Sequence, residues 1–340
     1  MASDKRPTIK DVAAHAQVSK STVSLVLQNS PQVKKETREA VTQAMAALGY
    51  VRNRAAATLR GSGTGLVGLI INDLRNPFFT EFATSVQMAL AEHGLATVIA
   101  NCDEDPDVQS RTIRSMLEHD VAGFIISPCY GDGTDGFLAI ERAKLPALQV
   151  LRQVETGAAP LPLFSHDYAS GGRMAVCHLL NQGVEKIAFI GGIEGRHITD
   201  ERMSGYLTEM NARSLPTMVL HGPATRAFGR EIVPRLIEQH PEAEAAICFN
   251  DLVALGLHAG LLETGRTPGK DFLLVGFDDI EEARLVYPPL ATVRCDVKRF
   301  GALAAKKLFD MIEHRGTQAS GERLAVELIP RASGTRSAEG

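Results

Sequence analysis

Short polar and basic side chains cluster just after residue 18, and their chemistry suits contact with nucleic acid. Ser19 can cap a helix that begins beside it, and Lys20 and Ser21 follow at its start, on the face away from the apolar Val23 and Val26. Hydroxyl and ammonium groups at the start of a helix can reach phosphates and base edges in the major groove. This segment is therefore predicted to be a DNA-reading helix.

Two further helices are predicted around this one. Thr8 is expected to cap a first helix, with Asp11 as its capping-box partner, and Gln17-Val18 makes the turn to the second helix. A third helix is expected from about Lys34 to Leu48, ended by Gly49. Residues 1–50 are thus predicted to form an all-α helix-turn-helix head.

The charge distribution agrees with a nucleic-acid partner for the head alone. Residues 1–60 hold 10 Lys and Arg against 4 Asp and Glu, a net charge of +6, and the remaining 280 residues hold 26 against 36, a net charge of −10. A cationic head on an acidic body suggests a polyanion that binds only the head. A solvated basic surface with no partner is the alternative.

Residues 51–64 are predicted to be a hinge helix and linker. Asn53 can cap a short helix through Ala55-Ala56-Ala57, and Gly61-Ser62-Gly63 ends it. Such a short helix is marginal in water, so it is expected to fold where DNA or a second copy supplies contacts. A plain interdomain linker remains the alternative.

From residue 65 the pattern changes to apolar, strand-like runs that alternate with amphipathic helices. This alternation predicts parallel sheets covered on both faces, and the number of units favours two doubly wound lobes over one sheet. Ligands of such sheets bind at the carboxyl ends of the strands, which two lobes would turn towards a shared cleft. Strands are expected at Leu66–Ile71, Ala96–Ala100, Gly123–Ser127, Ala147–Leu151, Lys186–Ile190, Thr217–Leu220, Ala245–Phe249 and Phe272–Gly276. Helices are expected at Pro77–His93, Asp107–His119, Gly171–Gln182, Thr199–Arg213, Arg226–Gln239, Leu252–Glu263 and Val297–His314.

Polar residues follow several of these strands. Arg152 follows the fourth, and three adjacent pairs follow the first strand and two strands of the second lobe: Asn72 and Asp73, Asn250 and Asp251, and Asp278 and Asp279. Amide, carboxylate and guanidinium groups that converge in a cleft would suit a polyhydroxylated ligand. Helix caps and turn residues are the alternative for each of them.

Other motifs point to no enzyme and no cofactor. Gly63–Gly68 fits G-x-G-x-x-G but enters a strand instead of following one, and the contiguous Ser165-His166-Asp167 lacks the separate segments that build a nucleophilic triad. The acidic run Asp103-Glu104-Asp105 is expected to be a solvated loop and helix N-terminus. No metal-ligand spacing occurs. The five scattered cysteines, the lack of a signal peptide and the lack of an apolar run near the ~20 residues that span a bilayer predict a cytoplasmic protein.

The same residues carry a family resemblance that extends over about residues 8–335. By its head, by Asn76-Pro77-Phe78-Phe79, by Val275-Gly276-Phe277-Asp278-Asp279 and by Pro289-Leu290-Ala291-Thr292-Val293, the chain resembles the LacI/GalR family of bacterial transcription regulators. The resemblance implies that Lys20 and Ser21 read bases and that Leu59 wedges into the minor groove, where it would kink the duplex. Leu25 and Gln17 depart from the Arg and Gly of many relatives. The residues expected to contact DNA are Thr8, Ser19, Lys20, Ser21, Thr22, Ser24, Leu25, Asn53, Arg54, Ala56 and Leu59.

For the body, the resemblance implies lobes like those of periplasmic sugar-binding proteins. The effector-binding and dimerisation domain is expected at residues 65–335, with lobe one at about 65–162 and 290–320 and lobe two at about 163–289 and 321–335. The chain would then cross between lobes near residues 163, 290 and 321. The residues expected to contact the effector are Asn72, Phe78, Phe79, Arg152, Asp167, Arg202, Asn250 and Asp278.

Together these observations predict a repressor whose operator affinity a sugar or sugar acid controls. Two copies would place their reading helices in successive major grooves of a near-palindromic operator. The small polar tail, residues 331–340, has no leucine heptads, which favours a homodimer over a tail-bundled tetramer. A corepressor-dependent regulator, a sugar-binding protein without a regulatory role and an enzyme on a doubly wound sheet are the alternatives, and the basic head opposes the second of them.

Overall fold

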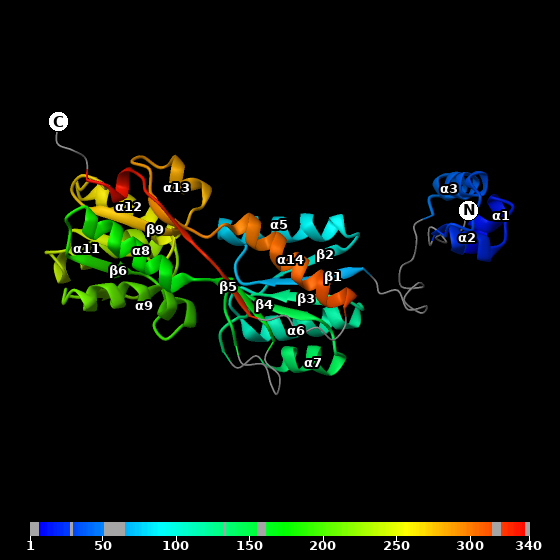
Figure 1. Cartoon of the computed structure of the whole chain (residues 1–340), viewed down its shortest axis with the longest axis horizontal. Coiled ribbons are helices and arrows are strands. Elements are labelled where there is room, and N and C mark those ends of the chain that lie inside the picture. The colour runs from blue at the N-terminus through cyan, green and yellow to red at the C-terminus, as the bar shows by residue number, and fades with distance from the viewer. Residues whose placement is uncertain are drawn as a thin grey trace, which may run out of the picture. The chain divides into compact units, whose positions relative to one another are not determined.

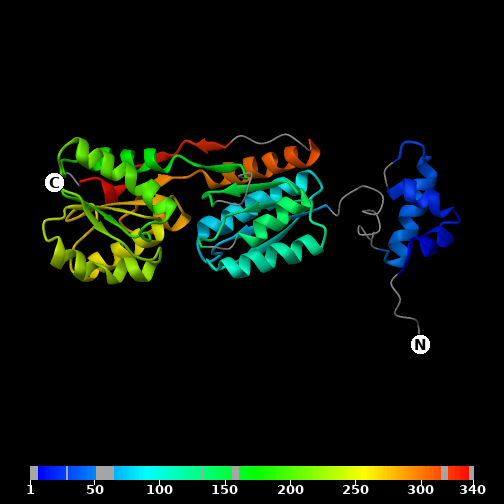
Figure 2. The same cartoon turned by 90° about the horizontal axis from the view of Figure 1, so that it is seen from below.

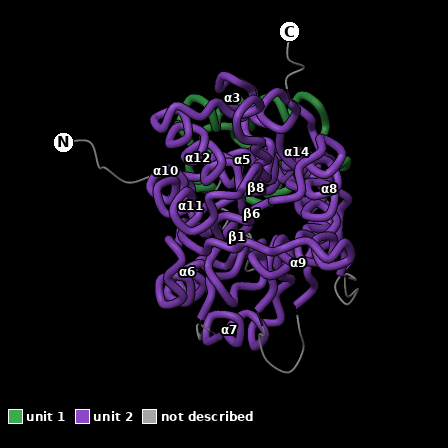
Figure 3. Tube along the Cα trace, turned by 90° about the vertical axis from the view of Figure 1, so that its left-hand side faces the viewer, with its two compact units in different colours: residues 1–64 green, residues 65–340 purple. Residues whose placement is uncertain are grey.

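The computed structural model describes residues 7–27, 30–50, 65–131, 134–154, 161–314 and 321–336. Figure 1 and Figure 2 show the chain in two views, and Figure 3 colours its two compact units, residues 1–64 and residues 65–340. None of the described helices combines the length and the apolar character needed to cross a membrane. Each unit is described by itself below.

The first unit is a three-helix bundle, as predicted. It contains α1 (Ile9–His15), α2 (Lys20–Leu27) and α3 (Lys35–Leu48). The helices pack around a small aliphatic core of Val12, Ala13, Val23, Val26, Val41 and Ala44. Because these residues recur at helical spacing, each helix buries one stripe and leaves the rest of its surface to solvent. Gly49, at φ 61°, ends α3 in the left-handed conformation that glycine adopts without strain.

The second unit begins with a six-stranded sheet in the order β11-β5-β4-β3-β1-β2, whose pairings are all parallel. Its strands are β1 (Leu66–Ile71), β2 (Ala96–Asn101), β3 (Gly123–Ile126), β4 (Ala147–Val150), β5 (Leu163–His166) and β11 (Glu322–Leu324). One face carries the packed pair α5 (Pro77–Glu92) and α14 (Val297–Glu313), and the other carries α6 (Pro106–Glu118) and α7 (Asp135–Ala143) (Figure 1).

A second sheet has the order β12-β10-β9-β8-β6-β7, parallel except that β12 runs antiparallel to β10. Its strands are β6 (Ile187–Ile190), β7 (Met218–Leu220), β8 (Ala245–Cys248), β9 (Leu273–Asp278), β10 (Ala291–Arg294) and β12 (Glu327–Ile329). One face carries α8 (Tyr168–Asn181) and α9 (His197–Ala212), and the other α10 (Arg226–Glu231), α11 (Val233–Gln239) and α12 (Asp251–Glu263) (Figure 2). The short α13 (Glu281–Leu285) and the 3-10 turn η1 (Ala332–Gly334) complete this lobe.

Three segments join the lobes, coloured green, orange and red in Figure 2, and each crosses later than expected from sequence. β5 still pairs with β4 in the first sheet, so the chain crosses after His166, a few residues beyond 163. β10 still pairs with β9 in the second sheet, so the next crossing follows Arg294, a few residues beyond 290. The third lies between β11 and β12, after residue 324 and a few residues beyond 321.

The elements that sequence patterns did not reveal are short or polar. β5, β10, β11 and β12 have three or four residues each, and polar side chains such as His166 and Thr292 interrupt their apolar pattern. α7 and α13 were not expected either. The helix expected over 226–239 is divided at Ile232, because Pro234 lacks the N–H group that would continue the hydrogen-bond ladder.

Candidate functional site

The N-terminus of α2 presents a cluster of hydroxyl groups beside an exposed lysine. The Ser19 oxygen accepts a hydrogen bond from the Thr22 N–H group (3.0 Å) and lies 2.7 Å from the Ser21 hydroxyl and 2.8 Å from that of Thr22. Ser19, Lys20 and Ser21 are exposed. The start of α2 therefore offers hydroxyl groups, one ammonium group and the positive end of the helix dipole to an anionic partner.

The other predicted DNA contacts in the head are less exposed or already engaged. Thr22, Ser24 and Leu25 are half-buried. Thr8 is exposed, but its hydroxyl and N–H groups both donate to the Asp11 carboxylate at 2.7 Å, so Thr8 is engaged in a capping box with Asp11 at the start of α1. The hinge residues Asn53, Arg54, Ala56 and Leu59 lie outside the described residues.

Gln17 occupies the turn between α1 and α2 in a left-handed conformation, with φ 52°. This conformation costs a residue with a Cβ atom roughly 1–2 kcal/mol, and glycine avoids that cost. The sequence singled out this position as one where a glycine would be expected, and the positive φ gives the reason.

In the second unit, a cavity of about 360 Å³ opens where the strands of both sheets end. Its volume falls in the range of small-ligand sites. The first lobe contributes Asp73, Asn76, Phe78, Phe79, Glu104, Tyr130 and Arg152 to the wall. The second lobe contributes Arg196, Thr199, Arg202, Thr225, Asn250 and Asp278.

An almost fully buried ion pair lies in the second-lobe wall. Arg202 Nη2 donates to Asp278 Oδ1 at 2.8 Å, and each side chain is 6% exposed. The Arg202 guanidinium also donates to the Phe249 carbonyl and lies 4.1 Å from the Phe277 ring centroid. Burial raises the pKa of the Asp278 carboxyl, and the neighbouring Arg202 charge opposes this shift. The pair therefore fixes a guanidinium and a carboxylate side by side at the cavity wall.

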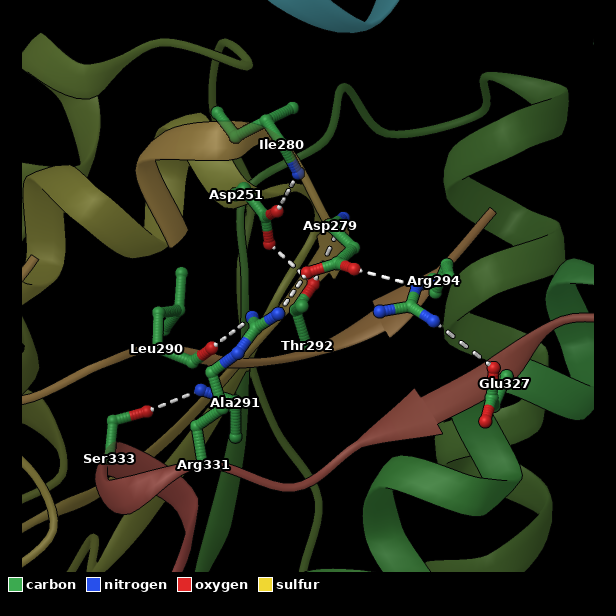
Figure 4. Close-up of polar contacts among 10 residues, drawn as sticks. All are labelled: Asp251, Asp279, Ile280, Leu290, Ala291, Thr292, Arg294, Glu327, Arg331 and Ser333. Atoms are coloured by element: carbon green, nitrogen blue, oxygen red, sulfur yellow. Dashed lines mark hydrogen bonds and ion pairs between the residues drawn. The ribbon is translucent and has the colours of Figure 1, made fainter. Parts of the chain in front are cut away.

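The backbone that carries Asp278 is strained, and a polar network holds it (Figure 4). Asp278 and Asp279 adopt φ 115° and 57°, which L-residues seldom do. The Asp279 carboxylate pairs with Arg294 at 2.7 Å and with Arg331 at 2.6 Å, which ties the end of β9 to β10 and to the chain after β12. Such strain is often found at ligand sites, where surrounding contacts stabilise it.

Asp251 supports the same region through buried hydrogen bonds. Its fully buried carboxylate accepts hydrogen bonds from the Thr292 hydroxyl (2.6 Å) and the Ile280 N–H group (2.9 Å) (Figure 4). Burial raises the pKa of Asp251 well above its usual range. The contacts of Asp251 and Asp279 position the wall, whereas Asp278 belongs to it.

In the first-lobe wall, Arg152 forms a two-pronged pair with Glu104, with both N–O distances at 2.9 Å. The Arg152 guanidinium carbon also lies 4.3 Å from the Tyr130 ring centroid. The Tyr130 hydroxyl accepts a long hydrogen bond, 3.4 Å, from the Ile198 N–H group at the start of α9. Tyr130 thus links the two lobes at the edge of the cavity.

The remaining predicted effector contacts divide into residues at the cavity and residues away from it. Phe78 and Phe79 line it as an edge-to-face pair with ring centroids 5.6 Å apart. Asn250 also lines it, while its side-chain oxygen caps α12 by accepting from Val253 N–H at 3.0 Å. Asn72 and Asp167 do not line it. Asn72 is buried and bonds to Ser127 and to the Pro128 carbonyl, and Asp167 caps α8 by accepting from Ser170 N–H at 2.9 Å.

Several cavity residues were missed from the sequence. The run Asp103-Glu104-Asp105 was predicted to be a solvated loop and helix N-terminus, and Asp105 does cap α6. The pairing of Glu104 with Arg152 at the cavity was not predicted. Asp73, Tyr130 and Arg196 were not singled out as contacts either. Asp73 and Tyr130 follow β1 and β3 within a few residues, so position after a strand was the available signal. Across the described ranges, no group of His, Cys, Asp and Glu side chains could hold a metal ion.

Comparisons with known proteins match both units. Residues 8–53 match the family model for bacterial regulatory proteins of the lacI family, and residues 64–332 match that for periplasmic binding proteins and the sugar-binding domain of the LacI family. The ribose operon repressor of Halalkalibacterium halodurans is 29% identical over 95% of this chain and 96% of its own. The regulator CelR of Thermobifida fusca is 30% identical over 97% and 99%.

Solved structures agree over nearly the whole chain. The lac repressor dimer bound to operator and an anti-inducer has a TM-score of 0.86 at 25% identity, covering 97% of this chain and 100% of the other. The complex of CelR with cellobiose has a TM-score of 0.73 at 28% identity, with the same coverage of both chains.

Proposed function

The chain belongs to the LacI family of DNA-binding transcription regulators, which are not enzymes, and from this premise we propose that it is a repressor controlled by a sugar or sugar acid. The observation that carries the effector assignment is the cavity of about 360 Å³ at the strand ends of both lobes. Its wall combines charged groups with the rings of Phe78 and Phe79, which suit the polar edge and the apolar face of a sugar. The names of the relatives, a ribose operon repressor and a regulator crystallised with cellobiose, support a sugar over other small molecules.

In this proposal the ligand acts through the relative position of the lobes. A ligand held by Arg152 of one lobe and by Arg202 of the other has different contacts in open and closed arrangements, so it shifts the balance between them. A shift of this kind would alter the hinge at residues 51–64 and change operator affinity through a coupling of about 1–3 kcal/mol. We propose that ligand binding releases the repressor from DNA. Several relatives are named HTH-type transcriptional repressor PurR. A corepressor would act by the same linkage with the opposite sign.

We also propose that the chain acts in the cytoplasm as a homodimer on a near-palindromic operator. The edge strand β2 leaves Val98 and Ile99 each 39% exposed, and Met88 on the neighbouring α5 is 63% exposed. Exposed apolar side chains on an edge strand and on the helix beside it favour burial of this surface against a partner. A dimer would supply the two reading helices that a two-fold symmetric site needs.

The test begins by selecting bound fragments from a pool of genomic DNA with the purified protein. Fluorescence anisotropy then measures affinity for the selected site against salt concentration. We expect Lys20→Ala to weaken binding and to lower the magnitude of the slope of log affinity against log salt by about 1, because one cationic group that displaces counterions from the DNA phosphates is lost. Lys270→Ala, in an exposed turn of the second unit, is the control and should match the wild type.

The ligand part of the test uses the same selected site. A thermal-shift screen over neutral sugars, sugar acids and purines identifies ligands, since a ligand at ~100 Kd adds about 2.7 kcal/mol of stability. A sugar or sugar acid that stabilises the protein should also release it from the DNA. Stabilisation by purines alone would refute the proposed effector class. A sugar or sugar acid that tightens operator binding would refute the proposed release from DNA.

A further inference from the structure

Arg196 differs from the other charged side chains of the cavity because it has no carboxylate partner within the described residues. Arg152 is paired with Glu104, and Arg202 is paired with Asp278. The remaining cavity carboxylate, Asp73, is paired with Arg75 at 2.7 Å. Arg75 also pairs with Asp103, so each carboxylate of the wall has a guanidinium partner, and among the three arginines that line the cavity only Arg196 has no ion-pair partner within the described residues.

The surroundings of Arg196 concentrate positive potential in one corner of the cavity. Its guanidinium carbon lies 4.6 Å from the centroid of the Tyr130 ring, the same ring that Arg152 contacts at 4.3 Å. Arg196 is also the N-cap residue of the 16-residue helix α9, and its own side chain makes no cap hydrogen bond. The first turn of α9 donates one long hydrogen bond, from Ile198 N–H to the Tyr130 hydroxyl, and holds the acidic Asp200, so the positive end of the helix dipole is partly offset there.

The neighbouring Arg152 has one buried donor atom without a partner in the described part of the chain. The buried Nε atom of Arg152 has no hydrogen-bond partner among the described residues, although its side chain is only 10% exposed. Buried donors are normally satisfied, and each exception calls for an explanation. Arg196 itself is half-buried, so a charge that it pairs with would be only partly screened by water.

We propose that the cavity takes a polyhydroxylated ligand that carries a negative charge, and that Arg196 is the residue that selects for this charge. This inference rests on the proposed effector site and names the chemical class of its ligand. A carboxylate or a phosphate can accept two hydrogen bonds from a guanidinium in one plane. A neutral sugar of the same shape would leave the Arg196 charge without a partner. The carboxylate of a sugar acid and the phosphate of a sugar phosphate share this chemistry.

The test compares matched ligands by isothermal titration calorimetry on the intact protein. The panel holds neutral hexoses and pentoses, the uronic and aldonic acids of the same stereochemistry, and their phosphates. For the stereochemistry that binds, we expect the anionic member to bind more tightly than the neutral one by about 10-fold or more, with an advantage that shrinks as salt rises. The tighter of the two anions identifies the source of the charge.

Arg196→Gln should lower the affinity for the anionic ligand by about 10- to 100-fold, as expected for the loss of charged hydrogen bonds, and leave the affinity for its neutral counterpart within about threefold. Arg196→Lys should keep part of the preference because it keeps the charge. Arg230→Gln, which removes an exposed guanidinium paired with Glu263 on the outside of the second lobe, is the matched control and should change neither affinity. Unfolding temperatures of all three variants establish that the fold is intact.

Two results would overturn the inference, and they differ from a failure of the proposed function. If a neutral sugar binds as tightly as its acid and phosphate, or if Arg196→Gln leaves the anionic preference unchanged, charge selection by Arg196 is wrong while the sugar effector stands. If no member of the panel binds and a ligand without hydroxyl groups does, the proposed effector class itself is wrong.

Discussion

The buried pair of Arg202 and Asp278 allows a prediction in which stability and pH dependence are linked. Arg202→Met keeps an unbranched side chain against the Phe277 ring but leaves the Asp278 carboxylate, 6% exposed, without its counter-charge. Breaking a buried pair by removing one partner costs about 3–5 kcal/mol, because the remaining charge is buried and uncompensated. We expect the free energy of unfolding to fall by about this amount at neutral pH.

The sign of the pH effect follows from the direction of the Asp278 shift. Burial already holds the pKa of folded Asp278 above its unfolded value, and loss of Arg202 raises it further. A carboxyl group with a raised pKa keeps its proton in the folded state over a pH range in which the unfolded state has already released it. This proton binding stabilises the fold fully below the unfolded-state pKa, and the stabilisation is lost as pH rises through the folded-state pKa. The variant should therefore lose stability on going from acidic to neutral pH, by at most about 1.4 kcal/mol per pH unit.

Urea unfolding followed by circular dichroism at several pH values between 5 and 8 measures both effects. The double variant Arg202→Met with Asp278→Asn should recover most of the loss and the wild-type pH profile, because no uncompensated charge remains. Arg226→Met is the control: its pair with Glu282 is 47% and 42% exposed, so its removal should cost less than about 1 kcal/mol. A single Arg202→Met variant as stable as this control, or no rescue by Asp278→Asn, would show that the pair does not hold the wall as described.

Two further changes test the head and the dimer. Gln17→Gly should stabilise the head by about 1 kcal/mol, seen as slower hydrogen exchange of the α1 and α2 amides, because glycine adopts φ 52° without strain. An equal gain in stability from Gln17→Ala, which keeps a Cβ atom, would contradict this reason. Ile99→Asp should shift the protein from dimer to monomer in light scattering at micromolar concentration, because it places a charge on the exposed edge strand β2; an unchanged dimer would place the interface elsewhere.

The sequence predicted the elements whose signals are local. The three head helices and the first strand, β1, fall where periodicity and capping placed them, since these patterns depend on residues a few positions apart. Short strands such as β5 and β10 were not predicted, because pairing with a neighbouring strand, and not their own composition, makes them strands. The crossings between lobes were displaced for the same reason.

The composition of the candidate site depends on contacts that no local pattern encodes. Asn72 and Asp73 are adjacent in sequence and both follow β1, yet Asn72 is buried against Ser127 and Asp73 lines the cavity. Glu104 and Arg152 are 48 positions apart and meet because β2 and β4 end at the same edge of one sheet. Charge pairing falls steeply with distance and depends on burial, so the strand order determines which charges neutralise each other.

By itself, therefore, the sequence determined a helix-turn-helix head, a doubly wound body and the strand ends where ligand contacts should gather, because helical periodicity, caps and strand–helix alternation are written along the chain. Only the tertiary structure decided which of those polar residues reach the cavity and which serve as helix caps or buried ion pairs. It also decided that Arg196 lies at the cavity wall with no ion-pair partner among the residues that the structure describes. The reason is physical: hydrogen bonds and ion pairs form between groups that are close in space, and the packing of two sheets brings together residues from segments far apart in the chain.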